Sequence, residues 1–328
     1  MKLFWVFLPF AAAYDSLIER VFDEWSVKFD RNWASKYERA FRFKIWLANH
    51  DLIEAHNSHD ESYTLGHNAF SDMTSDEFAN TFLKPFPVRP MIFNAIRQIK
   101  AQYWWNDSRI EPQASVDWRK KGVVGAVRNQ GQCGSCWAES AVASLEGAYA
   151  QHHPFRALSV QELVSCDDKN SGCKGGLMSN AFLWVNGNGL TAEEEYPYRS
   201  GERGHDYRCE LGVEDFEEVI AAGSVRHKDV PQHREDLMIS AANFNVLSAA
   251  VDATKFQFYE SGVFNPARCG SQLNHGVNII GYSTNTTIPY WIVRNSWGSD
   301  WGEKGYIDIA MGNNLCGINN EVTFAVVQ

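Results

Sequence analysis

The sequence has no excess of positive charge and no long apolar run. Its 30 Lys and Arg residues are outnumbered by 40 Asp and Glu residues, which gives a formal net charge of −10. A nucleic-acid-binding protein requires a basic face, so this balance argues against a nucleic-acid partner. No segment reaches the roughly 20 apolar residues that a membrane-spanning helix needs, and no membrane span is expected. We also find no internal repeat or low-complexity tract.

Cysteine is absent from the first third of the chain. Residues 14 to about 110 contain none, whereas all seven cysteines lie further on. This shift in composition marks a domain boundary near residue 110. Six of seven cysteines can form disulfides in 15 connectivities, so the count alone does not choose between them. Disulfides place a chain on the secretory route.

The N-terminus has the composition of a signal peptide. Met1 and Lys2 give a short basic start, residues 3–12 form an apolar run, and Ala11–Ala13 offers small residues for cleavage. We therefore expect a signal peptide over residues 1–13, a helical region over 14–110 and a second domain over 111–328. Glycosylation sequons at Asn106 and Asn285 are compatible with this route.

The cysteine-free region is predicted to be helical. Ser16 and Ser35 are each followed three residues later by a glutamate, the pattern of a capping box that opens a helix. Apolar residues then recur at near-helical spacing, which predicts the apolar faces of two helices. These residues are Leu17, Val21, Trp25 and Phe29 after Ser16, and Phe41, Ile45 and Leu52 after Ser35.

The segment Gln130–Trp137 reads QGQCGSCW and carries the main functional signal. A nucleophilic cysteine requires a lowered thiol pKa, a nearby base and donors for the oxyanion. A helix is predicted from Trp137 to Glu146, so Cys136 is expected at a helix N-terminus, where the dipole favours a thiolate. Taken alone, the Cys133–Cys136 pair could be a redox pair or half of a zinc site. No strand–helix–strand context and no second paired motif supports either alternative.

Two later segments supply partners for such a nucleophile. His275, in Leu273–Val277, follows Cys136 by 139 residues, and Asn295 lies in Val293–Gly298. A lone histidine, or a lone Asn-Ser-Trp-Gly turn, is more often structural than functional. Three segments that agree in residue type, order and spacing instead favour a cysteine nucleophile with a histidine base.

In these segments the chain resembles the papain and cathepsin family of cysteine proteases. The resemblance implies an α+β, papain-like two-lobe fold, with a helical lobe and a β-barrel-like lobe, preceded by a small helical prodomain. It implies that Cys136 is the nucleophile, that His275 is the base and later the acid, and that Asn295 orients the histidine. Gln130 would donate to the oxyanion, and Trp297 would shield the histidine–asparagine bond. The resting state would be a thiolate–imidazolium pair.

The same resemblance assigns the disulfides and the substrate cleft. It pairs the other cysteines as Cys133–Cys173, Cys166–Cys209 and Cys269–Cys316. Gly175 and Gly176 would expose backbone with which a substrate pairs as an extra strand. An apolar pocket would take the side chain two residues before the cut bond, and its lining would be Leu177, Met178, Ala250 and Leu273. Glu321 would close the floor of this pocket and admit arginine as well; the alternative is that it points to solvent.

Two motifs in the cysteine-free region resemble the inhibitory prodomain of cathepsin-L-like precursors. The first comprises Glu38, Arg42, Trp46, Asn49, Ile53 and Asn57, with Trp46 where phenylalanine is commoner. The second is Gly66-x-Asn68-x-Phe70-x-Asp72. The prodomain tail would run through the cleft in the direction opposite to a substrate, so that no bond is presented correctly for cleavage. Maturation is expected near Glu111–Pro112.

Acid is expected to release this prodomain. Glu38 and Arg42 have the i, i+4 spacing of a helical ion pair. The region also holds four histidines, His50, His56, His59 and His67. Protonation of paired carboxylates and buried histidines below about pH 5 would favour unfolding, unless these groups are solvated surface charges.

Two residues depart from the family pattern. Glu139 stands where relatives usually carry phenylalanine, and a carboxylate buried beside a thiolate would raise the pKa of the cysteine. Asn274 replaces the aspartate that is common before the histidine, and a modest effect on the pH profile is expected.

The prediction is a monomeric cysteine endopeptidase that cleaves polypeptides through a Cys136 acyl-enzyme. It is expected to be made as an acid-activated zymogen inhibited by its own prodomain, to need no metal or cofactor, and to work in a lysosome or acidic vacuole or outside the cell. A binding or inhibitory protein that keeps the fold without catalysis is a competing class, which thiol alkylation would separate. An enzyme that mainly ligates peptides would use the same residues.

Overall fold

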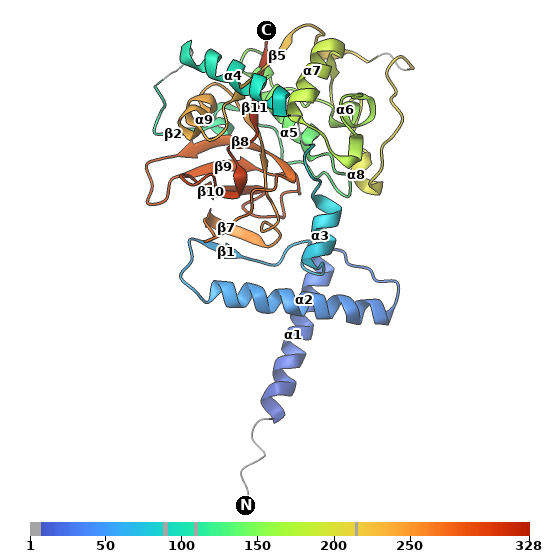
Figure 1. Cartoon of the computed structure of the whole chain (residues 1–328). Coiled ribbons are helices and arrows are strands. Elements are labelled where there is room, and N and C mark those ends of the chain that lie inside the picture. The colour runs from blue at the N-terminus through green and yellow to red at the C-terminus, as the bar shows by residue number, and fades with distance from the viewer. Residues whose placement is uncertain (1–7, 88–90, 108–110, 214–215) are drawn as a thin grey trace, which may run out of the picture.

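The computed structural model describes residues 8–87, 91–107, 111–213 and 216–328. Residues 8–82 form a helical region at one end of a two-lobed body, and the helix over residues 91–107 lies at its opposite end (Figure 1). Within the described residues, no helix combines the length and apolar character required to cross a membrane. The predicted signal peptide falls partly on residues 1–7, outside the described residues.

The N-terminal region is built on two long helices that cross, α1 (Leu8–Lys28) and α2 (Lys36–Asn57) (Figure 1). Ser35 caps α2, because its hydroxyl accepts the Glu38 N–H at 3.2 Å, as the capping pattern predicts. The matching pattern at Ser16 is not a helix start: α1 begins earlier and runs through it. The region continues through β1 (Tyr63–Leu65), α3 (Ser75–Phe82) and α4 (Met91–Asp107).

The apolar contact between α1 and α2 is aromatic, and the predicted face of α1 contributes to it through Val21, Trp25 and Phe29. Ile18, Phe22 and Trp25 pack against Trp46, with the Phe22 and Trp46 rings edge to face at 5.5 Å. Leu17, Phe41 and Leu52, which the periodicity assigns to apolar faces, are 45–55% exposed. A 3.6-residue repeat marks two adjacent stripes on each helix, and the bulky rings decide which stripe is buried.

The helical lobe surrounds one buried helix, α5 (Cys136–Ala150), which is buried from Cys136 to Ala148. It begins at Cys136, as predicted. The lobe also contains α6 (Val160–Cys166), α7 (Met178–Asn188) and the short α8 (Ser200–Arg203), with β3 (Leu190–Thr191) paired to β4 (Glu218–Ile220). α5 contacts both α7 and strands of the other lobe, so it joins the two lobes.

The second lobe is a sheet in the order β1-β7-β10-β9-β8-β6-β11-β5, with β2 paired to β8. Its strands are β2 (Ser115–Asp117), β5 (Val225–Val230), β6 (Leu247–Val251), β7 (Tyr259–Phe264), β8 (His275–Ser283), β9 (Tyr290–Arg294), β10 (Tyr306–Ala310) and β11 (Val322–Val327). The helix α9 (Glu235–Ala242) packs against it, as do helices of the other regions. β1 from the N-terminal region pairs antiparallel with β7.

Three disulfides join segments within each lobe, two in the helical lobe and one in the sheet lobe, and their pairing is the one that the resemblance implies. They are Cys133–Cys173, Cys166–Cys209 and Cys269–Cys316. Cys136 is the free cysteine, and it is buried.

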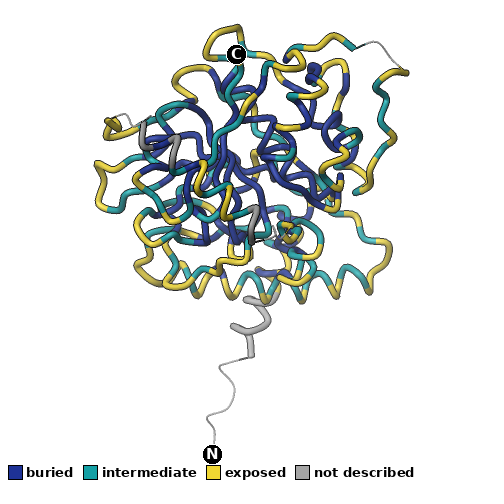
Figure 2. The backbone as a smooth tube through the Cα atoms, turned by 45° about the horizontal axis from the view of Figure 1, so that its top comes forward, coloured by how far each residue is buried: buried dark blue, intermediate teal, exposed yellow. Residues whose placement is uncertain are grey.

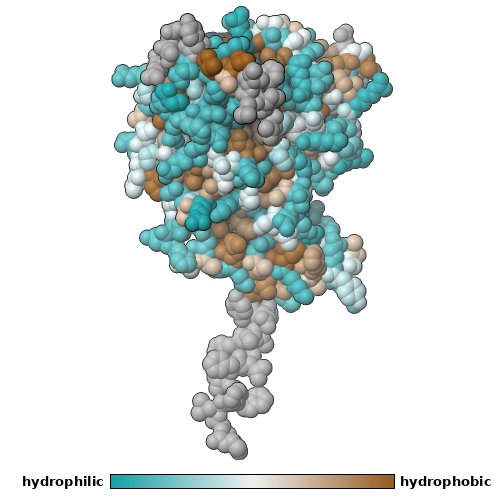
Figure 3. Space-filling model, in the orientation of Figure 1, coloured by the Kyte–Doolittle hydropathy of each residue, from teal (hydrophilic) through white to brown (hydrophobic). Residues whose placement is uncertain are grey.

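Burial is concentrated where α5 meets the sheet, and the loops around this core are exposed (Figure 2). The face seen in Figure 3 is mostly hydrophilic, with apolar residues gathered in patches, one of them near the crossing of α1 and α2. The fold therefore buries the segments that carry the candidate site.

Candidate active site

Two neighbouring strands bring His275 close to Asn295 and Trp297. His275 opens β8, and Asn295 directly follows β9, which pairs antiparallel with β8. The His275 Nε2 lies 2.6 Å from the Asn295 Oδ1, which can only accept, so Nε2 carries the proton. The opposite nitrogen, Nδ1, is left as an acceptor without a partner among the described residues. The Trp297 indole stacks on the imidazole at 4.6 Å and shields the bond.

Cys136 is placed beside this histidine by the close approach of α5 to β8. The backbone N–H groups of Gly276 and Trp137 hydrogen-bond the Cys136 side chain and lower the pKa of its thiol. A Cβ added at Gly276 would lie 2.8 Å from the Cys136 carbonyl oxygen, so only glycine allows α5 this close to β8.

Burial disfavours the charged forms of both the thiol and the imidazole in this structure, which opposes the expected thiolate–imidazolium pair. Burial raises the pKa of the Cys136 thiol to about 11, against the effect of its backbone hydrogen bonds. Burial lowers the pKa of His275 to about 4, although its bond to Asn295 acts the other way. The expectation assumed a cleft open to water, whereas here both groups are fully enclosed, and desolvation disfavours each charge.

The Gln130 side-chain amide points toward the position at which the substrate oxyanion is expected. Its Nε2 donates to the Cys133 carbonyl at 3.1 Å and to the Phe82 carbonyl at 3.3 Å. Its Oε1 accepts from the Ser296 hydroxyl at 2.8 Å, which fixes the direction of the amide. Our reading of the sequence assigned Ser296 no role, although it lies within the Asn-Ser-Trp-Gly motif. Phe82 ends α3, so a peptide carbonyl of the N-terminal region already meets this donor.

The chain beyond α3 continues along the cleft as an added strand. The Lys84 N–H donates to the Asn274 carbonyl at 2.9 Å, and the Phe86 N–H donates to the Leu273 carbonyl at 3.1 Å. On the other side, a Cβ built on Gly175 would lie 3.4 Å from the Lys84 Cβ, so this glycine, at φ +110°, lies close to the segment.

The expected pocket residues gather at one apolar cluster beside this segment. Met178 and Ala250 are buried within it, and Leu273 packs against it together with Phe86 of the N-terminal region. Leu177 is also buried. At Gly176 a side chain would collide with Asn170, so this position also requires glycine.

Glu321 lies next to this cluster and does not point to solvent. Its backbone carbonyl accepts the Ala250 N–H at 3.0 Å, and the residue is only 8% exposed. Its Oε2 lies 2.6 Å from the Nη1 of Arg97, on α4.

Comparison with known proteins agrees with this arrangement. Residues 112–326 match the papain family cysteine protease domain, and residues 22–78 match the cathepsin propeptide inhibitor domain. The chain belongs to the papain family of cysteine proteases. It is a cysteine endopeptidase with an intramolecular propeptide inhibitor, so the N-terminal helical region is its prodomain.

Relatives of this protease cover nearly the whole chain. It is 41% identical over 323 residues to cysteine protease XCP2 from Arabidopsis thaliana, covering 95% of this chain and 87% of that protein. It is 37% identical to a cysteine proteinase from Trypanosoma brucei brucei, covering 94% of this chain and 67% of that protein. The structure superposes on a recombinant stem bromelain precursor with a TM-score of 0.81 and 33% identity, covering 95% and 99% of the two chains.

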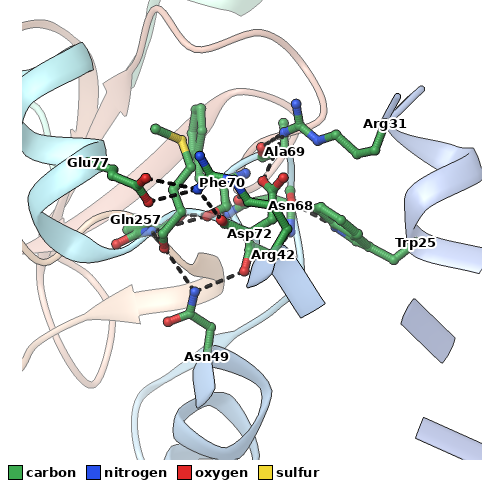
Figure 4. Close-up of polar contacts among 12 residues, drawn as sticks. Trp25, Arg31, Arg42, Asn49, Asn68, Ala69, Phe70, Asp72, Glu77 and Gln257 are labelled. Carbon is green, nitrogen blue, oxygen red and sulfur yellow. Dashed lines mark hydrogen bonds and ion pairs between the residues drawn. The ribbon is translucent and has the colours of Figure 1, made fainter. Parts of the chain in front are cut away.

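The prodomain motif Asn68-x-Phe70-x-Asp72 binds the protease through one glutamine (Figure 4). The Asn68 Nδ2 donates to the Gln257 carbonyl at 2.7 Å, and the Gln257 Nε2 donates to the Phe70 carbonyl at 3.1 Å. The buried Gln257 thus hydrogen-bonds both the backbone of the motif and the Asn68 side chain. No pattern in the sequence singles out Gln257, because its partners are almost 190 residues away.

The helix motif of the prodomain holds the same segment from the other side. The Arg42 Nη1 donates to Glu77 at 2.9 Å and to the Asp72 carbonyl at 3.0 Å, and the Asn49 Nδ2 donates to the Ser71 carbonyl at 2.9 Å (Figure 4). The expected Glu38–Arg42 pair is therefore wrong: Glu38 instead accepts a backbone N–H before α2. Arg42 gains more from Glu77, because this contact joins two elements.

Aromatic rings of the prodomain close over the tryptophan that covers His275. Phe70 and Phe78 meet the Trp297 ring edge to face at 5.7 and 5.2 Å. Phe78 is 1% exposed. The prodomain thus excludes water from the site through its own apolar core.

Glu139 lies buried in the first turn of α5, three residues after Cys136. Its carboxylate oxygens have no hydrogen-bond partner among the described residues, and the Arg128 Nε lies 3.9 Å away. Burial raises the pKa of Glu139 to about 7, and the Glu193 and Glu146 carboxylates add to the rise while Arg128 and Arg294 oppose it. Asn274 directly precedes His275 in the sequence. Its side chain faces away from His275, toward residues 252–254.

Proposed function

We propose that this protease is an acid-activated zymogen in which Cys136 attacks the substrate carbonyl, with His275, Asn295 and Gln130 as its catalytic partners. One observation carries the proposal. The Phe82 carbonyl of the prodomain accepts the Gln130 amide at 3.3 Å while the following residues pair with residues 273–274 as a strand. A peptide bond is therefore held at the site by contacts that a substrate can also make.

The geometry supports a defined sequence of proton and bond changes. The thiol proton of Cys136 passes to the free Nδ1 of His275, and the sulfur forms a bond to the substrate carbonyl carbon. The Gln130 amide and the Cys136 N–H hold the negative charge that develops on the carbonyl oxygen. Nδ1 then gives its proton to the leaving amine as the C–N bond breaks. Water, deprotonated by Nδ1, hydrolyses the acyl-enzyme and the thiol is restored.

The alternatives of an inactive binding protein or a peptide ligase rest on the same residues. No contact of the site favours either of them over hydrolysis. The candidate nucleophile, base, orienting amide and oxyanion donor are all present and adjacent, which an inactive relative would not need.

A pair of histidines in the prodomain supports activation by acid. The His50 Nδ1 and the His67 Nε2 lie 3.0 Å apart, and both rings stack on Trp46, at centroid distances of 5.2 and 4.3 Å. Burial, together with His50, lowers the pKa of His67 to about 4. Burial disfavours the charged form of His67, so protonation of this ring in acid favours separation of α2 from the segment before α3. His56 bonds the Tyr63 carbonyl and His59 is exposed, so neither has this property.

Protonation of Glu77 and protonation of Asp72 have opposite effects on the stability of the prodomain. Although burial raises it, the pKa of Glu77 is lowered overall by Thr74 and Arg42, so its stabilisation is present at neutral pH and is lost as the pH falls through the lowered pKa. Burial raises the pKa of Asp72 against the effects of Arg31 and Arg42, so protonation of Asp72 costs the prodomain no stability. We therefore assign the release between about pH 6.5 and 4 to His67.

The remaining features of the proposal concern maturation and specificity. A signal peptide over residues 1–13 and cleavage near Glu111–Pro112 would yield the mature enzyme, monomeric and exported or held in an acidic compartment. The three disulfides support this secretory route. The exposed Asn285, in the loop after β8, is accessible to glycosylation. The apolar cluster that Phe86 contacts supports a preference for apolar side chains two residues before the cut, with arginine admitted through Glu321.

Peptide hydrolysis by the full-length precursor tests the proposal. Two reporter peptides that differ only in leucine or arginine two residues before the cut are assayed before and after a shift to about pH 4.5. Hydrolysis that appears only after the shift, and is lost in Cys136→Ala, supports the zymogen, the nucleophile and the reaction. A processed but inactive protein with intact Cys136 would contradict the proposal and support the binding-protein class.

A further inference from the structure

Arg97 of the prodomain is buried against two carboxylates of the protease. Its Nη2 lies 2.7 Å from the Asp229 Oδ1, and its Nη1 lies 2.6 Å from the Glu321 Oε2. The Arg97 side chain is 9% exposed, and the two carboxylate side chains are 12% and 10% exposed. The two outer nitrogens of one planar guanidinium thus bind two different acids.

The two carboxylates are held in a fixed relation by the sheet. Asp229 lies on β5, and Glu321 directly precedes β11, whose Val322 and Thr323 pair with Val230 and Asp229. They therefore belong to adjacent strands at one edge of the sheet, and α4 lies against β5 there (Figure 1). Neither depends on the prodomain for its backbone position, so the pair remains when the prodomain leaves.

This acidic pair lies beside the apolar cluster of the proposed pocket. The Ala250 N–H bonds the Glu321 carbonyl, and Ala250 belongs to the cluster that Phe86 contacts from the cleft. The prodomain thus contacts this part of the protease at two places: Phe86 packs against the apolar cluster, and Arg97 binds the two carboxylates.

We propose that Asp229 and Glu321 together form a guanidinium site, which Arg97 fills in the zymogen and which selects arginine over lysine in substrates of the mature enzyme. The inference rests on the proposed pocket for the residue two before the cut, and it adds Asp229 as a second specificity determinant. A planar fork with fixed donors can bind both acids at once, whereas an ammonium group is a single point charge on a flexible stem. The apolar cluster packs the methylene stem of the arginine.

Charge and burial support the assignment. The Arg97 guanidinium lies between two carboxylates, and two acids at this spacing attract a basic side chain. Although burial raises it, the pKa of Asp229 is lowered overall by Arg97 and by the nearby His227, so Asp229 is ionised when the site is filled. A side-chain hydrogen bond from Thr323 also lowers the pKa of Asp229.

Steady-state hydrolysis by the activated enzyme tests the inference with three reporter peptides, carrying arginine, lysine or leucine two residues before the cut. For Asp229→Asn we expect kcat/KM for the arginine peptide to fall about tenfold, with the lysine peptide less affected and the leucine peptide unchanged. Glu321→Gln should lower kcat/KM for both the arginine and the lysine peptide. Asp236→Asn, which removes an exposed carboxylate from the same lobe, is the matched control.

The outcomes separate this inference from the proposed function. If no peptide is cleaved by wild-type enzyme, the proposed function fails. If leucine is cleaved and Asp229→Asn leaves the arginine-to-lysine ratio unchanged, the two-carboxylate site is wrong while the protease stands.

A change in the prodomain alone provides a second test that leaves the mature enzyme intact. Arg97→Lys keeps the charge but removes the fork, so the zymogen should hold its prodomain less tightly. We expect Cys136 in this precursor to be alkylated about tenfold faster than in wild type at neutral pH. An unchanged alkylation rate would overturn the selection of guanidinium over ammonium, even if Asp229→Asn fails to fold.

Discussion

The stacked rings of Trp46, His50 and His67 permit a quantitative test of acid release. In the full-length precursor, His67→Gln keeps a polar side chain that can contact His50 but cannot take up a proton. The wild-type ring binds a proton more weakly in the folded prodomain than in the unfolded chain, because burial lowers the pKa of His67 from 6.5 to about 4. Between these values the unfolded state binds more protons, so the free energy of unfolding falls as the pH falls.

The size of the effect follows from the two pKa values. Below both of them the gap corresponds to about 3 kcal/mol, at about 1.4 kcal/mol for each tenfold change in proton affinity. Solvent screening of the partly exposed ring reduces this, and we expect about 2 kcal/mol near pH 4.5. The population of the opened prodomain should then rise about 30-fold more in wild type than in His67→Gln between pH 7 and pH 4.5.

The opened population can be measured through the nucleophile itself. Cys136 is buried in the closed precursor, so its alkylation by a small reagent, followed by mass spectrometry before processing begins, reports opening. The wild-type to His67→Gln ratio of alkylation rates at each pH cancels the intrinsic pH dependence of the thiol. We expect this ratio to rise about 30-fold from pH 7 to pH 4.5. The exposed His59→Gln is the control, and a ratio that stays constant with pH would refute the role of the histidine pair.

Three further predictions concern the buried site. Gln130→Ala should lower kcat of the activated enzyme by about 100-fold to 1000-fold with little change in KM, because a donor to the oxyanion is lost; a kcat within a few-fold of wild type would contradict this. Glu139→Gln should extend the alkaline limb of kcat/KM by about one pH unit, since ionisation of Glu139 near pH 7 opposes the thiolate one helical turn away; an unchanged pH profile would show that the charge does not reach Cys136. Phe78→Ala removes a ring that is 1% exposed and should weaken prodomain docking by roughly 3 kcal/mol or more, so that uncleaved precursor hydrolyses peptide at neutral pH. Tyr37→Ala, at an exposed position of α2, is its control, and an inert Phe78→Ala precursor would contradict the prediction.

Local signals in the sequence were enough to predict some elements. The start of α5 at Cys136 and the Ser35 cap of α2 depend on residues close in the chain. The disulfide pairing and the two-lobe fold came from the resemblance to a family, because six cysteines do not determine their own connectivity. Periodicity found α1 and α2 and most of the buried face of α1, but it assigned the exposed Leu17 to that face and missed Ile18 and Phe22, whose burial depends on the rings of the other helix.

Contacts between distant segments could not be predicted. Arg42 has an acid one turn away on its own helix, yet it binds Glu77, because tertiary contact places that carboxylate and the Asp72 carbonyl together. Arg97 lies in a helix without a recognised motif, and its partners are 132 and 224 residues away. The raised pKa of Cys136 could not be predicted for a related reason: a helix N-terminus favours thiolate, but the thiol is buried in the precursor, and desolvation raises its pKa.

The pairing of β1 with β7 has a consequence for the mature enzyme. β1 is the terminal strand of the sheet, and it belongs to the prodomain. When the prodomain is removed, β7 becomes an edge, with the backbone donors and acceptors that faced Tyr63–Leu65 left open to solvent. Maturation therefore exposes two surfaces that the prodomain covers in the precursor, the cleft and this free strand edge. A protein inhibitor that reached both would imitate the precursor and bind at two separated places, with the gain in affinity that linked contacts provide.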